Sequence, residues 1–149
     1  MKQKYDLTTL VTLNPMHDQR VTSIELSGHT LIFHYSEMHY YNPCGKEAQS
    51  YLDSHKAFHS CDLSFSGIED ADVFAEIRKK DGLNIKATKY YDNDFLEFIR
   101  RNKYSLETIA FYYGYKSVIV HSMLVNPEGY YCEECIIKIC TSEIIYEWN

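Results

Sequence analysis

The chain has 149 residues, of which 45% are hydrophobic and 24% are charged, and its formal net charge is -6. This length and composition predict one globular domain over residues 1–149 and exclude a largely disordered chain. Residues 104–149 contain six acids and two bases, which disfavours binding to DNA or RNA phosphates and favours a basic protein partner.

The N-terminal segment, Met1-Lys2-Gln3-Lys4-Tyr5-Asp6-Leu7, does not resemble a secretory signal, and the chain has an odd number of cysteines, five. We therefore expect a cytoplasmic location, where thiols stay reduced. The longest apolar stretches are a few residues, whereas a membrane-spanning helix needs about 20, so we expect no membrane association.

The first predicted element is a hairpin over residues 20–41. Apolar and polar side chains alternate along both halves of this segment, as they do in half-buried strands. Ser27-Gly28 predicts the tight turn between the strands. The second strand then has an apolar row formed by Leu31, Phe33 and Tyr35, with His34 on the opposite face.

A helix is predicted from about Lys46 to Phe58, because one stripe at helical spacing contains Ala48, Tyr51, Leu52, His55 and His59. Residues 61–66 then alternate as a strand, with Cys61, Leu63 and Phe65 on one face. A second hairpin is predicted over residues 73–88, since Asp81-Gly82 between two alternating runs is a strong hairpin signal.

Asp92-Asn93-Asp94 predicts the start of a second helix, with Phe95, Phe98 and Ile99 on its apolar face. Further strands are predicted over residues 105–113, 117–124, 130–140 and 143–148. Consecutive strands joined by short turns are antiparallel. The predicted fold class is therefore α+β and β-dominated, with an antiparallel sheet of about eight to nine strands, as a sandwich or partial barrel, and one or two helices.

Cys132 and Cys135 have a spacing at which two thiolates can share one zinc ion. His55 and His59, on one face of the predicted helix, could complete such a site. The flanks, however, lack the turn residues of a zinc knuckle. In a strand the two cysteines would point to opposite faces, with Cys135 in a core-facing row beside Ile137 and Ile139, so we expect a plain strand and no cofactor.

The sequence does not indicate an enzyme. The two glutamates between Cys132 and Cys135 disfavour a reactive thiolate, and neither a nucleophile elbow nor a glycine-rich phosphate loop occurs. The acidic cluster Glu69-Asp70-Ala71-Asp72 could offer ligands to Ca²⁺ or Mg²⁺, but it lacks the EF-hand pattern and is expected to be a solvated turn. The histidines are expected to be solvated or hydrogen-bonded.

Tyrosine is abundant, with fourteen residues, and several occur in pairs: Tyr40-Tyr41, Tyr90-Tyr91, Tyr112-Tyr113 and Tyr130-Tyr131. In a strand each pair places one ring on each face. The exposed rings either pack across strands or form a patch that docks a protein.

A small, acidic, tyrosine-rich α+β chain without catalytic signatures is similar in general character to bacterial immunity proteins and other toxin-neutralising inhibitors. The leading hypothesis is therefore a cytoplasmic protein-binding module that neutralises a basic partner. The predicted contacts are Tyr130, Tyr131, Glu133, Glu134, Glu143 and Glu147. The alternatives are a zinc- or small-molecule-binding domain that uses Cys132, Cys135, His55 and His59, and a structural or assembly subunit that forms a homo-oligomer.

Overall fold

The computed structural model describes residues 1–6, 16–38 and 46–149, and within these residues the chain forms ten strands and two helices. The elements in chain order are β1 (Lys2–Asp6), β2 (Arg20–Ser27), β3 (Thr30–Glu37), α1 (Lys46–His55), β4 (Cys61–Ser66), β5 (Val73–Asp81), β6 (Asn84–Tyr91), α2 (Asp92–Asn102), β7 (Ser105–Gly114), β8 (Ser117–Val125), β9 (Tyr131–Cys140) and β10 (Glu143–Trp148).

All ten strands belong to one antiparallel sheet, in the order β1-β10-β4-β3-β2-β7-β8-β9-β5-β6, which is not closed into a barrel. This confirms the predicted β-dominated antiparallel fold with two helices. The sheet has one strand more than the nine segments predicted as strands. The additional strand is β1, which shows no apolar alternation and pairs with β10 along its whole length.

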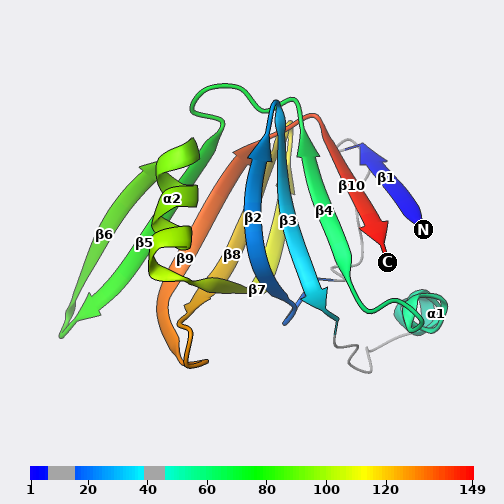
Figure 1. Cartoon of the computed structure of the whole chain (residues 1–149), viewed down its shortest axis with the longest axis horizontal. Coiled ribbons are helices and arrows are strands. Elements are labelled where there is room, and N and C mark those ends of the chain that lie inside the picture. Colours follow the sequence, from blue (N-terminus) through cyan, green and yellow to red (C-terminus); the bar gives the residue numbers. More distant parts are fainter. Residues whose placement is uncertain (7–15, 39–45) are drawn as a thin grey trace.

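The sheet consists of two halves that meet at a short seam. β2 pairs with β7 through two residue pairs, Arg20 with Glu107 and Val21 with Leu106. On either side of this seam the sheet folds over, so that β2, β3 and β4 lie in front of β7 and β8 in Figure 1. The core lies between the two halves.

Alternate residues of most strands fill this core. Leu31, Phe33 and Tyr35 of β3 are buried, as their alternation predicted, and Cys135, Ile137 and Ile139 of β9 form a buried row on the other half. The hydroxyl groups of Tyr35 and Thr108 lie 3.1 Å apart, within hydrogen-bond distance, and connect β3 to β7 through the core. The half-buried Tyr113 and the buried Tyr146 likewise connect β7 to β10 through their hydroxyl groups, 3.3 Å apart.

Helix α2 begins and ends where its sequence predicts. Asp92 and Asp94 place negative charge in the first turn, and Lys103 follows the last turn in the left-handed conformation, with its N–H bonded to the carbonyl of Arg100. Phe95 and Ile99 are buried. α2 contacts β2, β5 and β6, and in Figure 1 it lies beside the part of β2 that continues beyond the seam. A helix in this position covers an otherwise unpaired strand edge.

The predicted hairpin around Asp81-Gly82 is confirmed as β5 and β6, with Gly82 in the turn at a φ of +63°. Every residue from Lys79 to Lys89 is exposed. In Figure 1 this hairpin extends away from the rest of the sheet at the side opposite β1. We call residues 78–89 the β5–β6 arm.

Helix α1 falls inside the predicted segment 46–58, and His55 at its end is buried against Trp148, with ring centroids 4.8 Å apart. The side chains of Ala48 and Tyr51, as well as Tyr40 and Tyr41, lie outside what the structure describes. Within the described residues, no helix has the length and apolar character needed to cross a membrane.

Candidate functional site

The two cysteines of the Cys-x-x-Cys segment have opposite environments on β9. Cys135 is buried, whereas Cys132 is exposed and its thiol lies 3.5 Å from the carbonyl oxygen of Tyr130. This confirms the predicted strand geometry, in which residues three apart point to different faces. Burial raises the pKa of the Cys135 thiol well above its usual value.

The histidines proposed as partners of these cysteines lie elsewhere. His55 packs on Trp148 of β10, and His59 donates its backbone N–H to Asn149, directly after β10. Five strands separate β10 from β9 in the sheet. Among residues 1–6, 16–38 and 46–149 of the structure, no three His, Cys, Asp or Glu residues are grouped as a metal site requires.

The separation of β9 and β10 in the sheet also divides the six predicted partner contacts into two groups. One group, on β9 and just before it, contains Tyr130, Tyr131, Glu133 and Glu134, and the other, on β10, contains Glu143 and Glu147. Several of the carboxylates already pair inside the chain. Glu134 lies 2.8 Å from His121 and 3.8 Å from Arg78. Glu133 lies 3.9 Å from Lys79, and Glu143 pairs with Lys4.

The tyrosines of this predicted set are both exposed, so neither ring of the pair Tyr130-Tyr131 enters the core. Tyr130 lies between the turn at residues 127–129 and the start of β9, so strand alternation does not apply to it. The Tyr131 hydroxyl donates a hydrogen bond of 2.7 Å to Glu107, which raises the pKa of Tyr131. Glu107 also lies 3.3 Å from Arg20. Tyr131 is therefore held against the seam, and Tyr130 is the freer of the two rings.

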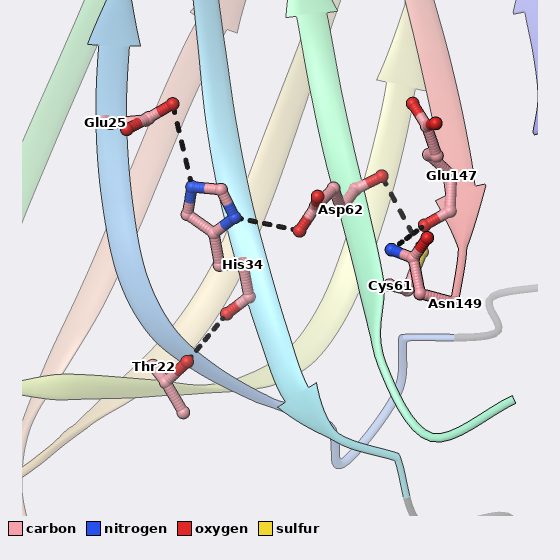
Figure 2. A network of polar contacts seen from close by, with 7 residues as sticks. All are labelled: Thr22, Glu25, His34, Cys61, Asp62, Glu147 and Asn149. Atoms are coloured by element: carbon pink, nitrogen blue, oxygen red, sulfur yellow. Dashed lines mark hydrogen bonds and ion pairs between the residues drawn. The ribbon is translucent and has the colours of Figure 1, made fainter.

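A histidine between two carboxylates lies on the outer face of the other half of the sheet (Figure 2). Nδ1 of His34 lies 2.8 Å from Asp62, and Nε2 lies 3.8 Å from Glu25. Register explains the arrangement, because His34 is directly opposite Asp62 across β3 and β4. The predicted orientation of His34, away from the apolar row, is confirmed.

A carboxylate–imidazole pair can activate a nucleophile only when a hydroxyl or thiol is bonded to the ring. Among the described residues, no hydroxyl or thiol makes such a bond to His34. The Thr22 hydroxyl donates instead to the backbone carbonyl of His34, at 3.1 Å. Cys61 is buried, and desolvation raises the pKa of its thiol. The His34 network therefore links three strands by polar contacts, and within the described residues it includes no nucleophile bonded to the ring.

A groove with a volume of about 730 Å³ lies between β2 and α2. Ile24 and Leu26 of β2 and Leu96 of α2 supply its apolar part. A β-bulge in β2 near Thr22 contributes to this apolar lining, since it allows Ile24 as well as Val21 to face inward. Tyr104 and Lys103 line the groove where α2 ends.

The groove adjoins an acidic hollow of about 650 Å³, and the two share Leu26, Asn93 and Asp94 in their linings. Four carboxylates line the hollow: Glu69, Asp70, Asp92 and Asp94. Asp92 accepts hydrogen bonds from the N–H groups of Ala71 and Val73, at 2.6 and 3.1 Å, so its role includes fixing the turn before β5. We call these two depressions together the acidic groove.

The sequence contained both acidic segments, one in the turn before β5 and one at the start of α2, but it did not indicate that they share a surface. Tertiary packing brings them together, because α2 returns beside β2 and the loop after β4. The expected solvated turn at Glu69-Asp70-Ala71-Asp72 is confirmed, with Asp72 accepting a 2.8 Å bond from the Glu69 N–H.

Comparison with known proteins adds no identification: no protein-family model, no curated protein and no solved structure matches this chain. The candidate site therefore rests on its own geometry and charge.

Proposed function

We propose that this chain is a protein-binding module that holds a basic segment of its partner in the acidic groove. Such a role is that of an immunity-type protein or inhibitor, which neutralises a partner by covering its surface. The observation that carries the proposal is the continuity of an apolar groove with a hollow bearing four carboxylates.

The distribution of ion pairs supports this surface over the predicted contacts on β9 and β10. Within the described residues, no Lys or Arg pairs with Glu69, Asp70 or Asp94, whereas Glu133, Glu134 and Glu143 each have an internal basic partner. Carboxylates without a nearby cation give the stronger negative potential, and a concave surface concentrates it. A basic partner is therefore steered towards the hollow.

The apolar part of the groove supports tight binding once contact is made. Ile24, Leu26 and Leu96 are only partly buried, although they pack against the core. Covering apolar surface stabilises a complex by about 25 cal/mol per Å² before the entropic costs of association. Long basic side chains suit this lining, because their aliphatic stems cover apolar surface while their charged ends reach the carboxylates.

The test compares two charge reversals on the full chain. One variant carries Glu69→Lys and Asp70→Lys; the matched control carries Glu133→Lys and Glu134→Lys. Partners captured from lysate at about 50 mM salt are identified by mass spectrometry, and the affinity of the purified partner is then measured at about 50 and 500 mM salt. We expect a basic partner whose affinity falls at least tenfold with the first variant and changes little with the control.

Two results would contradict the proposal. If no basic protein is recovered at low salt, the partner is not a basic protein. A partner that binds the groove variant normally and loses affinity for the Glu133/Glu134 control would place the contact on β9 instead. Circular dichroism of both variants checks that neither reversal unfolds the chain.

A further inference from the structure

The strand β6 has an unusually open outer edge. It lies at the end of the sheet order, and no strand of residues 1–6, 16–38 or 46–149 pairs with its other side. Figure 1 shows β6 as the outermost strand, with no element beyond it. Its pairing with β5 runs through eight successive residue pairs without a bulge. An edge of this length and regularity is a template for another strand.

The turn between β5 and β6 determines which backbone groups face outward. Gly82 and Leu83 form a two-residue turn, so Asp81 and Asn84 on either side exchange both ladder bonds. Alternation then directs the N–H and C=O groups of Ile85, Ala87 and Lys89 to the open edge. Three residues of β6 therefore present their backbone groups to an incoming chain.

The side chains of β6 also favour a partner. Ile85 is 63% exposed and Tyr91 is 50% exposed, and Leu83 at the turn is fully exposed. Edge strands are usually protected by proline, by bulges, by short length or by charge. β6 has only the last of these, in Lys86 and Lys89.

A groove beside β6 offers room for the side chains of an added strand. Its volume is about 430 Å³, and Tyr90 of β6 and Phe98 of α2 line it with their rings stacked at 4.6 Å. Lys89 and Arg101 line the same groove together with Asp94 and Glu97 of α2, and Glu97 pairs with Arg100 and Arg101. Alternate side chains of a strand added to β6 would point towards this groove, and the others towards the face that carries Tyr91.

Charge identifies the kind of strand that fits. The β5–β6 arm contains five bases, Arg78, Lys79, Lys80, Lys86 and Lys89, and a single acid, Asp81, in a chain whose net charge is -6. Lys80 and Lys89 have no carboxylate partner among the described residues, and Lys89 lies 5.8 Å from the ring centre of Phe74. A second copy of this chain, paired through its own β6, would bring two such basic sets together, which is unfavourable.

We propose that β6 is a docking edge at which an extended, acidic segment of a partner protein adds as a further strand. Backbone hydrogen bonds to Ile85, Ala87 and Lys89 give affinity, and the basic side chains select acidic residues. The β6 edge takes a ligand of opposite charge to that of the acidic groove, although Asp94 borders both the acidic groove and the groove beside β6. One chain can thus contact a basic and an acidic segment on different sides of α2.

The test uses a displayed library of random peptides of about ten residues, selected on the full chain. We expect the enriched peptides to be rich in Asp and Glu with alternating apolar residues. Their affinity should fall at least tenfold for Ala87→Pro, which removes one outward N–H, and stay unchanged for the matched Ala87→Ser. Lys86→Glu with Lys89→Glu should weaken binding similarly, whereas the distant Lys116→Glu should not.

Three results would contradict or redirect the proposal that β6 is a docking edge. Enrichment of no acidic peptide, or equal binding by Ala87→Pro and Ala87→Ser, overturns the proposal. A dimer of the chain alone that Ala87→Pro dissociates, seen by light scattering, would show that a second copy occupies the edge and overturns it too. If Ala87→Pro fails to fold, two versions of the selected peptide, N-methylated on alternate sets of amides, replace it: strand addition requires one to bind and the other to fail.

Discussion

Strand alternation on β9 gives two neighbouring thiols different chemical character. Cys135 faces the core beside Ile137 and Ile139, and desolvation raises its pKa. Cys61 is buried on the other half of the sheet, and desolvation also raises the pKa of its thiol. Cys132 faces solvent. A thiol reacts as its thiolate, so these surroundings determine which cysteine can be modified.

Alkylation of the native protein at about pH 8 tests this difference. We expect iodoacetamide to label Cys132 at least tenfold faster than Cys61 or Cys135, and all three at similar rates once the chain is unfolded. Peptide mass spectrometry after short exposures gives the rate at each site. Labelling of Cys135 at the rate of Cys132 in the folded chain would contradict the described orientation of β9.

Individual elements were largely predictable from sequence, because their signals are local. The Asp81-Gly82 signal for the hairpin of β5 and β6, whose turn residues are Gly82 and Leu83, depends on adjacent residues, and so does the acidic start of α2. β1 was not predictable, since it is a strand only through pairing with β10. The bulge in β2 that directs both Val21 and Ile24 inward likewise has no local signal.

The candidate site could not be predicted for a related reason. The acidic groove needs α2 beside β2, and the docking edge needs β6 at the end of the sheet, and both facts belong to strand order. The contacts predicted on β9 and β10, which stay a prediction, depend on charge counts along the chain. Such counts do not show that basic residues from other strands, Arg78 and Lys4, lie against Glu134 and Glu143.

Helix α2 is the element on which the groove depends, and removing its anchor should expose β2. Phe95 is fully buried at the first turns of α2. We expect Phe95→Ala to lower the free energy of unfolding by about 3 kcal/mol, the usual cost of truncating a buried phenylalanine. Amide hydrogen exchange should accelerate in residues 22–27 of β2, where α2 covers the edge, more than in β8.

Leu96→Ala serves as the matched control, because Leu96 is only partly buried on the same helix. It should cost less stability and leave exchange in β2 nearly unchanged. Uniform acceleration across all strands of the Phe95 variant would mean that α2 stabilises the sheet as a whole and does not specifically cover β2.

At the scale of the whole molecule, the two halves of the sheet are joined weakly through the backbone and strongly through the core. Two residue pairs join β2 to β7. Across the interior, the buried hydroxyl groups of Tyr35 and Thr108 bond each other, and burial raises the pKa of Tyr35 far above its usual value. A hydroxyl left without its partner in this position is costly, since water cannot replace it.

A double-mutant cycle measures how far this bond couples the halves. Tyr35→Phe and Thr108→Val should each lower the free energy of unfolding by about 1–2 kcal/mol, because each leaves a buried hydroxyl unbonded. The double variant should lose less than the sum of the two, since it removes both hydroxyl groups. Thr22→Val, at an exposed hydroxyl within one half, should cost under about 0.5 kcal/mol.

Urea unfolding followed by tyrosine fluorescence and by circular dichroism gives these values. The two probes should report one transition for the parent chain, because the halves share a core, and separate transitions would show that they unfold independently.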